Sequence, residues 1–231
     1  MILAGHQPNY LPWLGFFEKI RNCDMFLIAD NIQYEHQGFT NRNRIKNAQG
    51  AMWLTVPVEH TGRPMCVNEV RICNVPRGWA KRHWLSLKFN YCKAPFWEKY
   101  CGFFEQTYSQ EWALLIDLNM HLIRGIMEML NIEKPFVMAS SMPPVSEKKS
   151  EGLLAKCKAF KADTLLSGVG ARSYIVLKRF EEEGIKVVFQ DFQYAKYPQL
   201  YGEFIPNLSV VDYLFCTGGN HKEANDLPRE I

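Results

Sequence analysis

The first thirty residues constrain the fold of this chain more than any other stretch. A short apolar segment at 1–4 leads into the turn Gly5-His6-Gln7-Pro8, a helical pattern covers 13–21, and a second apolar run covers 25–29. Open α/β sheets begin with this order of a strand, a sharp turn, a helix and a second strand. We therefore predict an α/β fold with a mainly parallel, open, Rossmann-like sheet.

Later segments extend this pattern. We predict parallel strands near 1–5, 25–29, 136–140, 164–167 and 186–190, with helices at 146–160 and 173–183. Aromatic and aliphatic residues recur at helical spacing over 79–90, 95–106 and 111–130. We interpret about 75–132 as a helical insert in a single domain spanning 1–231. Segments 51–58 and 68–73 have the composition of short strands, and the tail from 194 reads as loop-rich.

Composition excludes several classes of protein. The formal net charge of +3 in 231 residues, with acids and bases mixed, is not the footprint of a nucleic-acid binder. There is neither a run of 18 apolar residues nor a basic segment before an apolar one, so we expect no membrane span and no signal peptide. The seven cysteines form no CxxC pair. They read as reduced thiols of a cytoplasmic protein rather than as zinc ligands.

Polar side chains follow the first two predicted strands where each strand ends. His6, Gln7, Asn9 and Tyr10 come after the first, and Asp30, Gln33 and Tyr34 after the second. Ligands of open α/β sheets bind beyond the carboxyl ends of the strands. His6 is our candidate general acid or base, because an unperturbed imidazole titrates near neutrality, and Asp30 would orient a base or accept a substrate hydroxyl. The structural alternative makes His6 a hydrogen-bonded turn residue and Asp30 a cap.

Two further groups are candidates for binding an anionic substrate. Arg42, Asn43 and Arg44 belong to a stretch with three cations in five residues, which either binds phosphate or carboxylate or forms a solvated hairpin arm. The turn Ser167-Gly168-Val169-Gly170-Ala171-Arg172 precedes a predicted helix, whose free N–H groups would favour an anion. It is equally readable as a plain tight turn. We add Gln199, in the loop-rich tail, to the candidate substrate-binding residues.

The sequence resembles the WbqC-like protein family over nearly its whole length. The resemblance is carried by HQPNYLPWLGFFEKI (6–20), DMFLIADNIQY (24–34), NRNRIK (41–46), WLTVPV (53–58), HWLSLKFNYCKAPFWEKY (83–100), LLSGVGARSYI (165–175) and YPQLYGEFIPNLSVVDYLF (197–215). It implies a bacterial protein of O-antigen and other surface-glycan gene sets. A weaker resemblance, to the nucleotidylyltransferase and class I aminoacyl-tRNA synthetase superfamily, lies at 13–16. Gly15 is retained there, but both histidines of the superfamily motif are replaced, which argues against adenylyl transfer.

Together these observations predict an enzyme, a transferase of surface-glycan (lipopolysaccharide) biosynthesis. It would transfer a group onto a nucleotide-linked amino sugar or a related phosphate-bearing small molecule. Two alternatives stay open: ATP-dependent activation of a carboxylate, and a non-catalytic sugar-nucleotide binding or scaffold protein. A cysteine nucleophile is disfavoured, because only Cys216 lies near a strand-end turn. The sequence leaves the cofactor and the oligomeric state open.

Overall fold

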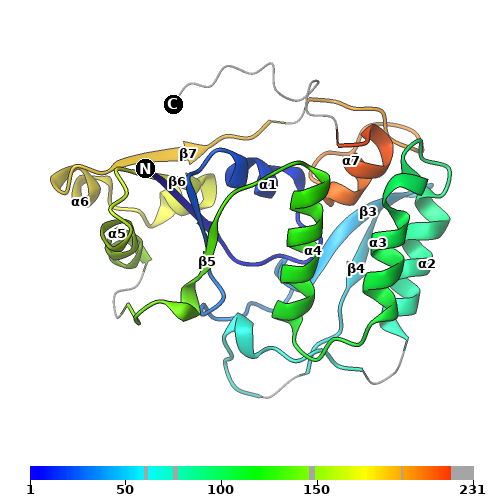
Figure 1. The fold of residues 1–231 in the computed structure, drawn as a ribbon, viewed down its shortest axis with the longest axis horizontal. Coiled ribbons are helices and arrows are strands. Elements are labelled where there is room, and N and C mark those ends of the chain that lie inside the picture. The colour runs from blue at the N-terminus through cyan, green and yellow to red at the C-terminus, as the bar shows by residue number, and fades with distance from the viewer. Residues whose placement is uncertain (60–61, 75–77, 146–148, 194, 220–231) are drawn as a thin grey trace.

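The fold is described from a computed structural model for residues 1–59, 62–74, 78–145, 149–193 and 195–219 (Figure 1). Five parallel strands form one sheet in the order β5-β2-β1-β6-β7. They are β1 (Ile2–His6), β2 (Met25–Ile28), β5 (Phe136–Met138), β6 (Thr164–Gly168) and β7 (Lys186–Gln190). The α/β class and all five strands predicted from the apolar runs are confirmed.

Alternate side chains of the strands enter two separate hydrophobic clusters, one on each face of the sheet. In β1, Ala4 belongs to the larger cluster and Leu3 to the smaller one, as the two-residue period of a strand requires. Helix α1 (Leu14–Arg21) packs on the larger cluster through Phe16 and Phe17. Helices α5 (Lys149–Ala159) and α6 (Leu177–Glu182) pack on the smaller one. The sheet is therefore covered on both faces, as expected for parallel strands.

The strand order reverses direction at β1. From β1 the chain passes through α1 to β2 on one side, whereas β6 lies on the other side of β1 and leads through α6 to β7. Crossovers that leave in opposite directions open a crevice at the carboxyl ends of the two central strands. The seam between β1 and β6 is thus where this fold can hold a ligand.

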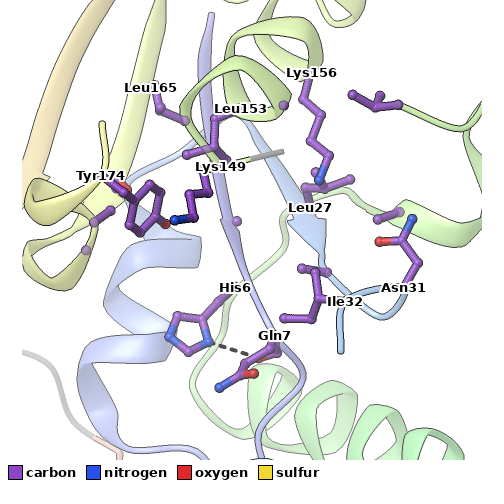
Figure 2. A pocket seen from close by; sticks show the side chains of 18 of the residues that line it. His6, Gln7, Leu27, Asn31, Ile32, Lys149, Leu153, Lys156, Leu165 and Tyr174 are labelled. Carbon is purple, nitrogen blue, oxygen red and sulfur yellow. Dashed lines mark hydrogen bonds between the residues drawn. The ribbon is translucent and has the colours of Figure 1, made fainter. Parts of the chain in front are cut away.

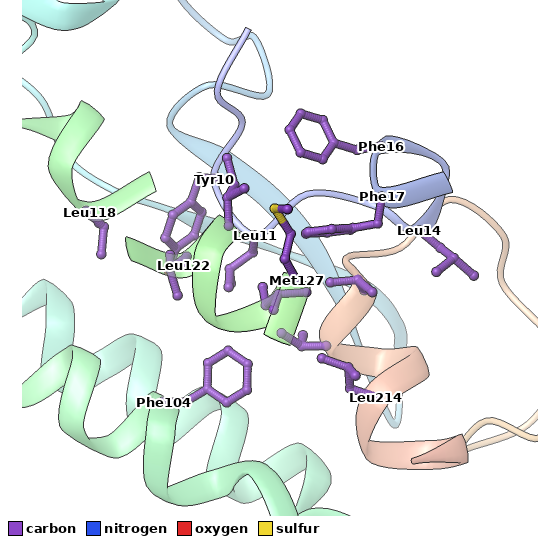
Figure 3. Close-up of a cluster of buried hydrophobic side chains, with 14 of the residues drawn as sticks. Tyr10, Leu11, Leu14, Phe16, Phe17, Phe104, Leu118, Leu122, Met127 and Leu214 are labelled. Atoms are coloured by element: carbon purple, nitrogen blue, oxygen red, sulfur yellow. The ribbon is translucent and has the colours of Figure 1, made fainter. Parts of the chain in front are cut away.

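The larger cluster also contains the helices α2 (Trp79–Tyr91), α3 (Trp97–Ser109), α4 (Leu115–Met129) and α7 (Val210–Thr217). Figure 3 shows Tyr10 and Leu11, which follow β1, among side chains of α3, α4 and α7. Contact between α3 and α4 requires a glycine, because a Cβ on Gly125 would lie 2.2 Å from the Phe103 ring. The three helices predicted between 79 and 130 are confirmed.

Helix α7 lies in the tail, which the sequence analysis predicts to be loop-rich, so this helix was not predicted. Ser209 caps its start by accepting a hydrogen bond from the Val211 N–H. Gly218 ends it in the left-handed region, with φ 74°, and a Cβ there would collide with Phe96. A helix of eight residues, seven of them buried, carries little amphipathic signal to distinguish it from an apolar loop.

Smaller elements connect the layers. β3 (Arg42–Asn47) and β4 (Gly50–Thr55) form an antiparallel hairpin apart from the main sheet, which confirms the strand predicted from 51 onward. The short strand predicted at 68–73 does not form as a continuous element, and only Arg71 and Ile72 make isolated β-bridges, to Leu114 and Val58. The 3-10 helix η1 (Val67–Glu69) begins there, because the Glu69 carboxylate accepts a hydrogen bond from the Cys66 N–H at 2.8 Å. Two further 3-10 helices, η2 (Ala139–Ser141) and η3 (Val169–Ser173), follow β5 and β6.

Within the described residues, no helix combines the length and apolar character needed to cross a bilayer.

Candidate functional site

A cavity of about 820 Å³ lies at the carboxyl edge of the sheet, at the β1–β6 seam (Figure 2). This is within the usual volume range of small-molecule sites. The end of β1 contributes Gly5, His6 and Gln7, the end of β6 contributes Ser167 and Gly168, and the segment after β2 contributes residues 31–33. Helix α5 forms the opposite wall, so one cavity receives side chains from both faces of the sheet.

The charge of this cavity is one-sided. Its described lining includes the cations Lys19, Lys149 and Lys156, but no aspartate or glutamate. Since cations outnumber anions in a partly enclosed space, the potential inside favours an anionic ligand. The described residues contain no group of three His, Cys, Asp or Glu side chains placed to hold a metal ion. The three lysines of the cavity lining suit phosphate or carboxylate groups.

Lys19 is the most unusual of these cations. Its side chain is only 4% exposed, and within the described part of the chain its ammonium has neither a hydrogen bond nor an ion pair. The Nζ atom lies 3.3 Å from the position that a Cβ of Gly168 would occupy. Burial lowers the pKa of Lys19 from 10.5 to about 8, because the charged form loses hydration without gaining a partner. Lys19 is nevertheless mostly protonated at neutral pH.

His6 lies at the end of β1 with a defined tautomer. Its Nδ1–H donates to the Gln7 carbonyl at 2.9 Å, since a carbonyl oxygen can only accept, so the neutral ring carries its free lone pair on Nε2. The Phe16 ring packs edge-on against the imidazole. Burial and the nearby Lys19 charge lower the pKa of His6 from 6.5 to about 4. His6 is therefore uncharged at neutral pH, and the expectation of titration near neutrality is corrected.

The two lysines of α5 are more accessible. Lys156 is half-buried, and burial lowers its pKa, opposed by the charge of Asp30. Lys149 is exposed at the start of the helix, and Figure 2 shows its end pointing toward the Tyr174 hydroxyl. Both lysines are therefore at least partly open to solvent, whereas Lys19 is buried.

The cavity brings together five of the residues singled out from the sequence: His6, Gln7, Gln33, Ser167 and Gly168. Asp30 is buried outside the described lining. One of its carboxylate oxygens accepts from the Ser140 N–H at 2.9 Å and the other from the Ser140 hydroxyl. Asp30 thus ties the end of β2 to η2. Arg172 is exposed, with its guanidinium 5.1 Å from the centre of the Phe189 ring, and also lies outside this lining.

Asn9 and Tyr10 turn into the protein instead of the cavity. Tyr10 is fully buried, and its hydroxyl is hydrogen-bonded to Nδ1 of His83 at 2.8 Å and to the Tyr108 hydroxyl. Asn9 is 4% exposed and does not contribute to the described lining. The turn after β1 reverses the chain, so its first residues face the crevice while the next ones anchor the helices of the larger cluster.

Tyr34 and Arg42 line a second cavity of about 610 Å³ beside the β3–β4 hairpin. Asn43 is buried and donates to the Leu11 carbonyl at 2.7 Å, and Arg44 donates to the Asn207 carbonyl at 3.4 Å. The Arg42 guanidinium also lies 4.3 Å from the centre of the Trp53 ring. The predicted cation cluster therefore belongs to the hairpin and not to the described lining of the sheet-edge cavity.

Gln199 connects the segment before α7 to the hairpin through hydrogen bonds. Its side-chain oxygen accepts from the buried Lys46 ammonium at 3.1 Å and from the Ile205 N–H at 2.9 Å. The Lys46 ammonium also donates to the Glu203 carbonyl at 2.5 Å. These contacts fasten the segment before α7 to β3, away from both cavities.

Sequence reasoning missed Lys19 and the α5 lysines of the cavity. One signal was present, because Lys19 lies three residues after Phe16 and therefore on the apolar face of α1, where a lysine is out of place. Residues 14–20 are all buried in this helix. A charge on a buried helix face is a functional candidate when the fold provides a crevice beside it.

Comparison with known proteins assigns the family. The sequence profile of the WbqC-like protein family matches residues 7–224. A protein of Mycobacterium tuberculosis (strain ATCC 25618 / H37Rv), named "Uncharacterized protein Rv1507c", is 37% identical over 227 residues, which cover 96% of this chain and 95% of that protein. No solved structure matches this chain significantly. On the extent of both matches, the chain belongs to the WbqC-like protein family.

Proposed function

We propose that this protein is a transferase of bacterial surface-glycan biosynthesis, such as O-antigen assembly, acting on a nucleotide-linked amino sugar or a related phosphate-bearing precursor. The observation that carries the proposal is the lysine-lined cavity at the β1–β6 seam, which has no carboxylate among its described lining residues. Its volume suits a molecule of nucleotide-sugar size. Family membership is compatible with this role.

In this proposal the lysines hold the diphosphate and His6 faces the reacting group. The Nε2 lone pair of His6 accepts a hydrogen bond from the substrate amine or hydroxyl, because Nδ1–H is committed to the Gln7 carbonyl. As the bond between this nucleophile and the transferred group forms, the bond between that group and its donor carrier breaks, the electron pair leaves on the carrier, and the proton of the nucleophile passes to Nε2. A bound phosphate would offset the Lys19 charge that lowers the pKa of His6, so substrate binding would make the imidazole a better base.

The test begins with ligand binding and continues with turnover. Thermal-shift measurements with UDP- and dTDP-amino sugars, ATP, acyl-CoA and S-adenosylmethionine identify the substrates, because a ligand that binds the native state raises the melting temperature. Mass spectrometry then detects transfer between the ligands that bind. ATP consumption with a carboxylate would instead indicate carboxylate activation, and binding without a product would indicate a binding or scaffold protein.

His6→Asn tests the chemistry once a reaction is found. Asparagine keeps one hydrogen bond but cannot carry a proton near neutral pH, so we expect the rate to fall by roughly 10²–10⁴. The ligand-induced melting shift should stay as in the unaltered protein. If His6→Asn turns over normally, the acid–base role of His6 is refuted.

A further inference from the structure

We propose that the Lys19 ammonium and the bare Cα of Gly168 form the subsite that binds one phosphoryl group of the substrate. This inference rests on the proposed function, and it assigns the phosphate contact to α1 and the last residue of β6. From the sequence we predicted anion contacts at Arg42 and Arg44 and at the turn 167–172, which includes both Gly168 and Arg172. Those three arginines lie outside the described lining of the cavity.

The first support is the uncompensated charge of Lys19. The side chain is 4% exposed, and its ammonium has no partner among the described residues. Buried ammonium groups are normally paired, since an unpaired buried charge is costly. The other ionisable groups coupled to Lys19 are His6, which is neutral, and the Cys23 thiol, whose pKa is raised to about 12. An anionic ligand would supply the missing partner.

The second support is the glycine beneath the ammonium. Gly168 has φ −81° and ψ 155°, a conformation open to any residue, so backbone geometry does not require glycine at this position. A Cβ here would lie 3.3 Å from Nζ of Lys19, so the ammonium would have to shift by a few tenths of an ångström. The glycine therefore lets the ammonium lie against the carboxyl end of β6 without this adjustment.

The third support is the arrangement of the cations around the cavity. Lys19 comes from α1 on one face of the sheet, whereas Lys149 and Lys156 come from α5 on the other. A diphosphate at the seam would be contacted from both sides. Lys19 would bind one phosphoryl group deep in the cavity, and the more accessible α5 lysines would bind the other.

Binding of UDP, with uridine as the uncharged comparison, tests this subsite directly. In calorimetry near pH 7, Lys19→Met should weaken UDP binding by roughly 10- to 100-fold, the usual loss when a hydrogen bond to a charged group is removed. Gly168→Ala keeps every charge and should weaken UDP binding by displacing the ammonium. Lys158→Met is the matched control, because Lys158 is an exposed α5 lysine paired with Glu183 at 2.8 Å. UDP should bind this variant as it binds the unaltered protein.

A chemical-modification experiment on the unaltered protein tests the subsite without relying on the folding of a variant. Reductive methylation followed by peptide mass spectrometry should show Lys19 protected by UDP but not by uridine. If Lys19→Met binds UDP like the unaltered protein, or if UDP gives no protection, the subsite is refuted while the proposed cavity function stands. If the unaltered protein binds no phosphate-bearing ligand, both proposals fail.

Discussion

Lys19→Met should make this protein more stable near neutral pH. The pKa of Lys19 falls from 10.5 to about 8 on folding, and each pKa unit corresponds to about 1.4 kcal/mol. Retaining a proton on this buried amine therefore costs the native state about 3 kcal/mol at neutral pH. Methionine fills similar space without a charge and has a similar helix propensity. We expect the free energy of unfolding to rise by up to this amount, a gain of roughly 6–12 °C in melting temperature for a chain of this size.

The pH dependence of that gain identifies its cause. Below about pH 8 both the native and the unfolded Lys19 are protonated, and the penalty is complete. Between about 8 and 10.5 the native state releases its proton first, so the stability of the unaltered protein rises with pH relative to the variant. Above 10.5 the penalty is gone. The coupled groups, with pKa about 4 for His6 and about 12 for Cys23, titrate outside this window.

Urea unfolding of both proteins across this pH range measures the difference. It should shrink by about 1.4 kcal/mol per pH unit between the two pKa values. Lys158→Met should differ little from the unaltered protein at any of these pH values, because exposed ion pairs contribute at most about 1 kcal/mol. A Lys19→Met protein that is less stable near pH 7, or a stability difference that does not vary with pH, would refute the account of a buried, unpaired ammonium.

Three further outcomes follow from the structure. UDP affinity of the unaltered protein should fall as pH rises above about 8, where Lys19 loses its proton, whereas Lys19→Met should show no such fall in calorimetry. Tyr10→Phe removes a buried hydroxyl with two partners and should lower the free energy of unfolding by about 1–3 kcal/mol in urea melts, leaving UDP affinity unchanged. Asp30→Asn weakens the link to Ser140 and should cost about 1.5–3 kcal/mol, again by urea unfolding. If turnover per folded molecule of Asp30→Asn falls sharply, Asp30 is again the candidate base.

The sheet could be predicted because its signals are local. Each strand is a short apolar run followed by polar turn residues, and parallel strands with both faces covered need little more to be recognised. Elements that depend on distant contacts were less visible. Helix α7 is defined by its burial in the larger cluster, and η1 is held by hydrogen bonds from the Val67 and Asn68 N–H groups to the carbonyls of Ile32 and Asp30.

Only those residues of the candidate site that lie at the ends of strands could be predicted from the sequence. His6, Gln7 and Gly168 follow strands directly, so topology brings them together. The direction in which a turn sends its later side chains is set by tertiary packing, and Tyr10 therefore entered the core. The environment of Lys19 likewise requires the fold, because nothing local to α1 shows that β6 ends beside it in a glycine.

The β1–β6 seam has a consequence for how the protein is made. Ile2 of β1 pairs with Thr164 of β6, so the first strand waits for a partner that the ribosome delivers late. At about 5–20 residues per second that delay is roughly 10–30 s, during which one edge of β1 has no native partner. Unpaired strand edges promote association between chains. Slower initiation or a holding chaperone should therefore improve the soluble yield more than any change within the cavity.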